Sequence, residues 1–283
     1  IKIQIMRILI VSQYFYPENF RVNEIAFYLS RKGYEITVLT SKPNYPKGKF
    51  FKGYSFFNRN TERFRGIKII RIPTIPRLKG GVLGMVLNYL SFLFFGFITI
   101  IFRIKNQYDI ILATQLSPAT SLLTALWVKK MYGTPILLWV LDLWPESFYA
   151  NSGFRIKYID LIIERISNKI YNNSDSLLIS SMFFQKSITK RLLTEKRFTF
   201  FPNWAEDVFY NKKKRYIKNS YVFPKGFNIV FAGNIGESQG FDEIVEAARL
   251  TSKSLINWII IGDGRKKEFI KHKTKKLMLN NIF

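Results

Sequence analysis

The stretch at residues 6–18, MRILIVSQYFYPE, begins with a run of aliphatic residues and continues into a loop of aromatic residues and proline. The run at 7–12 is rich in Ile, Leu and Val, which is typical of a strand buried on both faces of a parallel sheet. Residues 21–31 follow with apolar side chains at helical spacing, and Gly33 closes that helix before a second strand at 35–40. This order predicts a parallel βαβ unit.

The same alternation continues along the chain. Further strands are expected at 67–72, 109–114, 136–141 and 176–180, with helices at 119–131, 156–171 and 183–193. A second series has strands at 228–232 and 258–261, a helix at 241–250 and a lysine-rich helix from 266. We predict an α/β protein with two Rossmann-like domains, at 6–206 and 227–283, joined by a basic linker at 207–226. Residues 1–5 resemble an upstream extension, and residues 41–66 form a long loop rich in proline and glycine.

The composition excludes several kinds of chemistry. The chain has no cysteine, so disulfides, thiolate metal sites and cysteine nucleophiles are unavailable. Its one histidine, His272, lies in a lysine-rich stretch, which leaves little material for a zinc site or a Ser-His-Asp triad. Catalysis must therefore use carboxylates, backbone dipoles or cations. The net charge of +25 indicates a polyanionic partner, namely nucleic acid, an anionic membrane or a phosphorylated substrate, or else a compositional bias of the source.

Two acidic residues follow the predicted strand at 136–141, in the segment DLWPES at 142–147. Ligands of parallel α/β sheets bind beyond the carboxyl ends of the strands, so Asp142, Trp144 and Glu146 are placed to meet sugar hydroxyls. The plainer interpretation is that Asp142 caps a turn and Trp144 belongs to the core. We take Asp142 and Glu146 as the candidate catalytic residues.

A glycine-rich junction, GNIGESQG at 233–240, follows the strand at 228–232. Glycines at such a turn let backbone N–H groups approach a phosphate at a helix N-terminus. The candidate phosphate-binding residues are Gly233, Asn234, Gly236 and, after the next strand, Gly262. Tight turns explain the same glycines equally well. The loop at 13–19 lacks the G-x-G-x-x-G spacing, which argues against an NAD or FAD enzyme.

Read in order, these segments resemble the retaining GT-B glycosyltransferases, the family that includes sucrose synthase. The matching segments are MRILIVSQYFYPE, SKPNYPKG at 41–48, DLWPES, FPNWAEDVFY at 201–210, FAGNIGESQG at 231–240 and IIIGDGR at 259–265. Among them, SQYFYPE, PNYPKG and DLWPES look closest to the branch that contains the L-fucosamine transferases of bacterial O-antigen and capsule assembly.

The resemblance implies a reaction. A sugar passes from a UDP- or GDP-linked donor to an acceptor with retention of anomeric configuration and without a metal or other cofactor. The acceptor, expected to be a lipid-linked saccharide, lies on the N-terminal domain beside Asp142, while Gly233, Asn234 and Gly236 approach the donor phosphates. Many relatives have a histidine at the place of Leu141, and Arg and Lys at the places of Asn234 and Gln239.

The apolar segment at 81–102 has no charged residue and is flanked by Arg77 and Lys79 on one side and Arg103 and Lys105 on the other. It is long enough to span a bilayer. A span inside a crossover between strands of one sheet would place those strands on opposite sides of the membrane. We therefore expect a helix that either covers the sheet or lies in the interface at the cytoplasmic face of the membrane.

By the same resemblance, the second domain is expected to continue past Phe283, because two strand–helix units are too few to close a doubly wound domain. Two alternatives to an active transferase follow. One is an inactive, truncated remnant. The other is a basic nucleic-acid-binding protein, suggested by charge alone and opposed by the lack of any helix-turn-helix, zinc or RNA-recognition signature.

Overall fold

The computed structural model describes residues 5–78, 82–105, 107–152, 157–205, 222–236, 239–264 and 266–283. The chain divides into two compact units, one of residues 1–147 and 156–203 and the other of residues 148–155 and 204–283. Most of the predicted linker, residues 207–221, lies outside the described residues.

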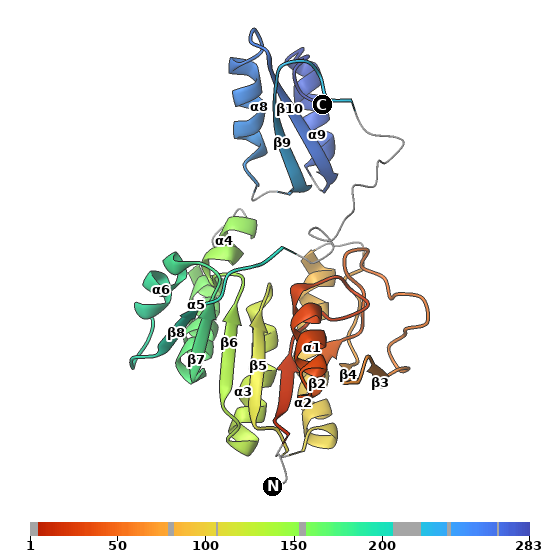
Figure 1. Cartoon of the computed structure of the whole chain (residues 1–283), viewed down its shortest axis with the longest axis vertical. Coiled ribbons are helices and arrows are strands. Elements are labelled where there is room, and N and C mark those ends of the chain that lie inside the picture. The colour runs from red at the N-terminus through yellow and green to blue at the C-terminus, as the bar shows by residue number, and fades with distance from the viewer. Residues whose placement is uncertain are drawn as a thin grey trace. The chain divides into compact units, whose positions relative to one another are not determined.

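The first unit is built on an eight-stranded sheet in the order β3-β4-β2-β1-β5-β6-β7-β8 (Figure 1). Neighbouring strands pair in parallel except β3, which runs antiparallel to β4. The strands are β1 (Arg7–Val11), β2 (Glu35–Ser41), β3 (Thr61–Phe64), β4 (Ile67–Ile72), β5 (Ile110–Gln115), β6 (Ile136–Val140), β7 (Ser176–Ile179) and β8 (Arg197–Phe200). Because the parallel strands share one direction, their carboxyl ends meet at one edge of the sheet.

The central strands are buried on both faces, as their aliphatic sequences predict. Leu9, Ile10 and Val11 of β1 have no exposed surface, and Val38 and Leu39 of β2 beside them have none either. Apolar side chains on successive positions therefore point into two cores, one above and one below the sheet.

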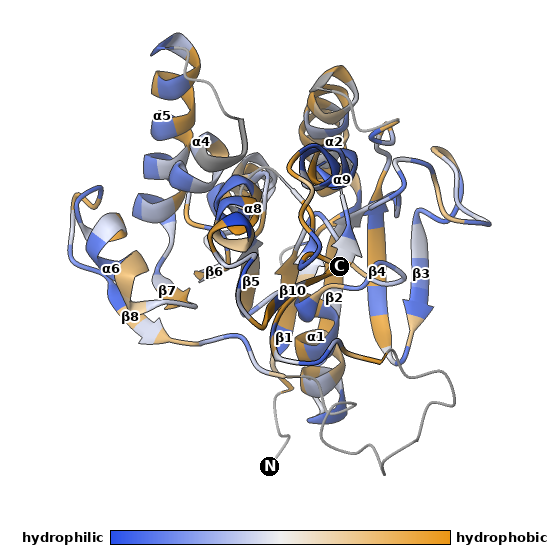
Figure 2. Ribbon diagram, turned by 90° about the horizontal axis from the view of Figure 1, so that it is seen from above, coloured by the Kyte–Doolittle hydropathy of each residue, from blue (hydrophilic) through white to orange (hydrophobic). Residues whose placement is uncertain are grey.

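Helices α1 (Arg21–Arg31) and α2 (Val82–Arg103) lie on opposite sides of this sheet (Figure 2). Their placement follows from right-handed crossovers, since α1 leads from β1 to β2 and α2 leads in the other direction, from β4 to β5. The remaining helical segments are η1 (Ala119–Leu122), α3 (Leu123–Tyr132), α4 (Glu146–Ser152), α5 (Lys157–Asn173) and α6 (Met182–Thr189).

The inner face of helix α2 combines the buried apolar residues Phe92 and Ile100 with buried polar residues, while its outer face is apolar. Asn88 is fully buried, accepts a hydrogen bond from Gln13 Nε2 at 2.9 Å and donates one to the carbonyl of Ile75 at 2.6 Å. Ser91 Oγ, also buried, accepts from the backbone N–H of Ile75 at 2.9 Å. Phe94, in contrast, is 64% exposed. Helix α2 therefore differs from an ordinary surface helix in two ways, since its buried face includes hydrogen-bonded polar residues and its exposed face is apolar.

The predicted loop at 41–66 contains a strand, and the prediction of a wholly irregular loop was wrong. Strand β3 pairs with β4 so that Phe64 lies opposite Ile67, with Arg65 and Gly66 as the two-residue turn. Both turn residues have positive φ, 50° and 80°, which suits a tight hairpin with right-handed twist. The edge strand β8 and the short helix α4 were also absent from the prediction.

The second unit contains two parallel strands, β9 (Phe227–Asn234) and β10 (Ile256–Asp263), with helices α8 (Phe241–Leu250) and α9 (Lys267–Lys276). Its core is formed by apolar side chains from the helices, the turn after β9 and the segment after α9, among them Ile235, Phe241, Val245 and Ile270. Beyond α9 the chain pairs with β10 in parallel, through a bridge between Trp258 and Ile282. This arrangement places the carboxyl ends of β9 and β10 side by side.

Candidate active site

Asp142 lies at the carboxyl edge of the first unit's sheet, directly after β6. Its backbone N–H donates to the carbonyl of Gln115, at the end of β5, at 3.0 Å. Its Oδ2 accepts two hydrogen bonds from Ser117, from the backbone N–H and from the hydroxyl, each at 2.9 Å. No hydrogen bond to Oδ1 occurs among the described residues, and the side chain is partly exposed. One carboxylate oxygen is fixed and the other is open to a ligand.

Two buried aromatic residues, Trp144 and Tyr171, stabilise this arrangement through hydrogen bonds. The buried indole of Trp144 donates to Ser117 Oγ at 3.1 Å, so Ser117 is fixed between the indole and Asp142. The Tyr171 hydroxyl donates to the carbonyl of Trp144 at 2.9 Å and accepts from Gln115 Nε2 at 2.8 Å. Burial raises the pKa of Tyr171 to about 12, so its hydroxyl stays protonated as a donor. Trp144 therefore belongs to the core, as the plainer interpretation held, while Asp142 faces outward.

Glu146 has partners of a different kind. Its Oε1 accepts from Ser187 Oγ at 2.6 Å and from Arg191 Nη2 at 2.8 Å, which ties the start of α4 to α6 and the turn after it. Burial raises the pKa of Glu146, but these hydrogen bonds outweigh it and hold the pKa below its usual value. This geometry favours a structural role, and a catalytic role for Glu146 stays a prediction.

The loops after β1 and β2 contribute a buried carboxylate that the sequence reasoning did not select. Glu18 Oε1 accepts from the backbone N–H groups of Asn44 at 2.8 Å and Tyr45 at 2.7 Å, so one side chain joins both loops. Burial raises the pKa of Glu18 to about 7. Its Oε2 is buried without a hydrogen-bond partner in the described part of the chain. The signal available in sequence was an acid in the loop after the first strand.

Arg77 lies at the same edge among three tyrosine rings. Its guanidinium is 5.1 Å from the ring centre of Tyr14 and 5.4 Å from those of Tyr45 and Tyr89. It donates to the hydroxyls of Tyr14 and Tyr89, and among the described residues it has no carboxylate within ion-pair distance. Sequence alone showed Arg77 only as a basic flank of the apolar segment.

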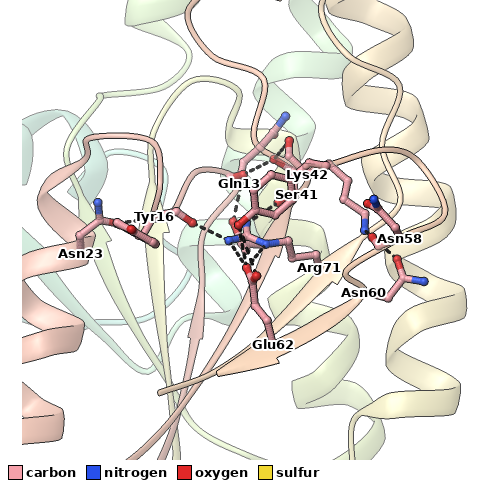
Figure 3. A network of polar contacts seen from close by, with 11 residues as sticks. Gln13, Tyr16, Asn23, Ser41, Lys42, Asn58, Asn60, Glu62 and Arg71 are labelled. Carbon is pink, nitrogen blue, oxygen red and sulfur yellow. Dashed lines mark hydrogen bonds and ion pairs between the residues drawn. The ribbon is translucent and has the colours of Figure 1, made fainter. Parts of the chain in front are cut away.

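Deeper in the same loops, a network of polar side chains joins β2, β3 and β4 (Figure 3). Arg71, fully buried, forms an ion pair with Glu62 at 2.5 Å and donates to the carbonyls of Ser41 and Tyr16. Lys42, also buried, donates from Nζ to the carbonyl of Asn58 and to Asn60 Oδ1. The network fixes the loop after β2 against the β3–β4 hairpin.

In the second unit, the predicted phosphate-binding glycines lie at the ends of β9 and β10. Gly262 pairs in register with Gly233, and a Cβ added to Gly262 would lie 1.9 Å from the Gly233 carbonyl oxygen. A Cβ at Gly236 would lie 2.5 Å from Asn234 Nδ2. Close backbone packing therefore explains Gly262, whereas the contacts of Gly236 are with the ends of flexible side chains and the nearest atom to a Cβ at Gly233 is 3.4 Å away. A role of Gly233, Asn234, Gly236 and Gly262 toward phosphate stays a prediction.

Within the described ranges, no three His, Asp or Glu side chains gather as a metal site would require.

Comparison with known proteins identifies the class of enzyme. No protein-family model matches the chain. WcaI of Escherichia coli strain K12, named as a glycosyl transferase of colanic acid biosynthesis, is 24% identical over 297 positions, which cover 98% of this chain and 70% of WcaI. WbjE of Pseudomonas aeruginosa, named as a glycosyltransferase, is 24% identical over 159 residues, covering 55% of this chain and 40% of WbjE.

Several solved structures share the fold of this chain. The sucrose-phosphate synthase of Thermosynechococcus elongatus matches with a TM-score of 0.70 at 11% identity, over 98% of this chain and 69% of that one. An Escherichia coli trehalose-6-phosphate protein bound with UDP-2-fluoro glucose matches with a TM-score of 0.63 at 11% identity, over 98% and 72%. The lipopolysaccharide outer core galactosyltransferase WaaB matches with a TM-score of 0.54 at 14% identity, over 98% and 67%.

The chain shares the α/β fold of these proteins and is similar in sequence to two glycosyltransferases. The predicted α/β class with a parallel sheet is confirmed, and so is the predicted class of enzyme. Catalytic roles for Asp142 and Glu146, retention of configuration and the branch of the family stay predictions.

Proposed function

We propose that this transferase moves a sugar from a UDP- or GDP-linked donor to a lipid-linked saccharide, with retention of configuration, in the assembly of a bacterial surface polysaccharide such as O-antigen or capsule. The observation that carries the proposal is the carboxylate of Asp142, which Ser117 fixes at the carboxyl edge of the sheet with one oxygen open. Ligands of parallel α/β sheets bind at this edge. A fixed carboxylate there suits an acceptor hydroxyl or the positive charge that develops on a reacting sugar.

Similarity supports the substrate classes. WcaI is named for colanic acid biosynthesis and WaaB for the lipopolysaccharide outer core. The trehalose-6-phosphate protein carries a UDP-sugar analogue. The carboxyl ends of β9 and β10, where Gly233 pairs with Gly262, lie side by side, and this edge of a parallel sheet suits a donor diphosphate.

We propose further that α2 contacts the cytoplasmic face of the membrane without crossing it. Residues 83–103 are long and apolar enough to span a bilayer, and 33% of the apolar window is buried. However, α2 connects β4 to β5 of one sheet, and Asn88 is hydrogen-bonded to the loops that follow β1 and β4. Its outer face exposes large apolar side chains along its whole length: Leu83, Val86, Leu90, Phe94, Phe97, Ile98, Ile101 and Phe102. Such a face suits the lipid interface, and it would bring the enzyme to a lipid-linked acceptor.

Transfer assays test the proposed reaction. The chain would be incubated with radiolabelled UDP- or GDP-sugars and a lipid-linked saccharide extract, and the anomeric configuration of the product read by NMR. We expect Asp142→Asn to abolish transfer with an unchanged melting temperature, whereas Glu195→Gln, an exposed change of the same charge, keeps it. Unchanged turnover in Asp142→Asn would remove Asp142 from the mechanism, and an inverted product would refute retention.

Liposome flotation tests the proposed membrane contact. Phe94→Gln combined with Leu90→Gln should reduce flotation with anionic liposomes at low salt, since both side chains are exposed on the outer face of α2. Phe183→Gln, a change at an equally exposed aromatic residue of α6, serves as the control and should leave flotation unchanged. A wild-type chain that stays in the soluble fraction would refute the contact.

A further inference from the structure

A cavity lies between α2 and the β3–β4 hairpin. Its volume is about 240 Å³. Phe95, Ile98 and Phe102 of α2 form an apolar wall, and Asn60, Arg71 and Arg103 contribute polar groups. The cavity is smaller than the ~300–1,000 Å³ of clefts that enclose a drug-sized ligand. It therefore suits the polar head group of a ligand whose other atoms lie outside the cavity.

We propose that this cavity binds the phosphate diester of an anionic membrane phospholipid, with Arg103 contacting the phosphate and the first part of the acyl chain lying along Ile98 and Phe102. The proposal rests on the proposed membrane contact of α2. It concerns a site apart from Asp142, because β4, which supplies Arg71, is separated from β6 by three strands of the sheet.

Positive charge around the cavity exceeds negative charge. Arg103 is exposed and, within the described part of the chain, donates one hydrogen bond, from Nη1 to Thr61 Oγ1 at 3.0 Å. Arg71 lies beneath the cavity and has Glu62 as its ion-pair partner. Lys42 binds the uncharged oxygens of Asn58 and Asn60 (Figure 3). Among the described residues, these three cations share one carboxylate, so an anion at Arg103 would complete the charge balance.

The pKa of the buried Lys42 reflects this excess of positive charge. Burial, together with repulsion from Arg71 and, more weakly, from Arg103, lowers the pKa of Lys42 to about 8 against the opposing effect of Glu62. An anion bound beside Arg103 would offset this repulsion. The charge arrangement therefore favours an anionic ligand independently of the apolar wall.

The apolar wall of the cavity favours an anion that carries an acyl chain over a free phosphate or a nucleotide. Phe102 is 78% exposed and Ile98 37% exposed, and both belong to the outer face of α2 that we place at the lipid interface. A free phosphate or a nucleotide would leave this wall in water. A phospholipid covers it with the chain while its phosphate meets Arg103, so that charge and apolar surface are both matched.

Binding of short-chain lipids in solution tests the site without a bilayer. The full chain would be titrated calorimetrically with dihexanoyl phosphatidylglycerol, dihexanoyl phosphatidylcholine and inorganic phosphate, each lipid below its micelle concentration. We expect saturable binding of phosphatidylglycerol alone. Arg103→Gln should weaken it by about tenfold, as expected for losing a hydrogen bond to a charged group. Arg103→Lys should restore part of it, and Arg197→Gln, at an exposed arginine of β8, should leave it unchanged.

The outcomes of this titration distinguish a lipid site in the cavity from the proposed membrane contact of α2. Equal binding of phosphatidylcholine would refute anion recognition, and binding of phosphatidylglycerol that Arg103→Gln leaves intact would refute the site. Saturable binding of inorganic phosphate with the same affinity would mean that the apolar wall has no role. If the chain floats with liposomes but does not bind the short-chain lipid, the membrane contact stands and the cavity site fails. Melting temperatures of the variants, compared with wild type, exclude a loss of binding through unfolding.

Discussion

Glu18 should make the stability of this enzyme fall as the pH rises. Its side chain is 1% exposed, and burial raises the pKa of its carboxyl from 4.5 to about 7, against the opposing effect of the hydrogen bonds from Asn44 and Tyr45. In this range the folded state binds more protons than the unfolded state, so the free energy of unfolding decreases with pH. At ~1.4 kcal/mol for each pKa unit, the loss between pH 4.5 and 7 amounts to roughly 3 kcal/mol.

Glu18→Gln isolates this contribution. The amide oxygen of glutamine can accept the same two backbone N–H bonds, while the group no longer titrates. We expect the difference in free energy of unfolding, variant minus wild type, to rise by roughly 3 kcal/mol between pH 4.5 and 7 and to stay constant on either side. Its absolute value also includes the burial of a new N–H group at the position of Oε2, so the change with pH is the informative quantity.

Urea denaturation followed by tryptophan fluorescence, at half-unit steps from pH 4 to pH 8.5, measures this difference. Glu195→Gln provides the control, because this exposed glutamate loses the same charge without leaving a buried site. Curves for Glu18→Gln and wild type that run parallel across the whole range would refute the reasoning. They would mean that the backbone N–H groups of Asn44 and Tyr45 stabilise the carboxylate as fully as water does.

Three further substitutions test other parts of the structure. Gly262→Ala should destabilise the second unit by ~1–3 kcal/mol or more, because the added Cβ would lie 1.9 Å from the Gly233 carbonyl oxygen. Gly233→Ala should cost less, because the nearest atom to its Cβ would be 3.4 Å away. Equal urea midpoints for the two variants would contradict this. Tyr171→Phe should cost ~1–3 kcal/mol of stability and lower turnover, since the Trp144 carbonyl loses its donor and Gln115 loses one of its acceptors; unchanged thermal melting and turnover would separate Tyr171 from the Asp142 site. Glu146→Gln should cost at most ~1 kcal/mol, as expected for a pair whose carboxylate is 43% exposed, and leave turnover intact; a large fall in turnover would establish the catalytic role instead.

The order of strands and helices was predictable from sequence because the central strands are continuously aliphatic. The strands at 7–12, 35–40, 67–72, 109–114, 136–141 and 176–180 all occur, with ends shifted by at most two residues. The edge strands β3 and β8 were not predicted, since TERF and RFTF alternate with charged or polar residues and pack on one side only. Their strand conformation depends on the neighbouring strand rather than on their own composition.

The candidate site was predictable only in part. The position of Asp142 follows from local sequence, because a residue directly after a buried parallel strand must lie at the carboxyl edge. The partners of Glu146 do not, since Ser187 and Arg191 come from a helix and turn about 40 residues later. The same holds for Glu18, whose two N–H donors lie on the loop after β2. Pairing across loops depends on the register of the whole sheet, which no single segment encodes.

The buried, hydrogen-bonded polar residues of α2 have a consequence in detergents and lipid. An ordinary surface helix is held by the hydrophobic effect, which disappears when the surrounding solvent is itself apolar. Helix α2 is held in its rotational setting by Asn88 and Ser91, which are hydrogen-bonded to Gln13 and to the backbone of Ile75. Hydrogen bonds of this kind strengthen where water is excluded. Immersing the outer face in acyl chains would therefore strengthen the attachment of this helix to the loops that follow β1 and β4 instead of extracting it.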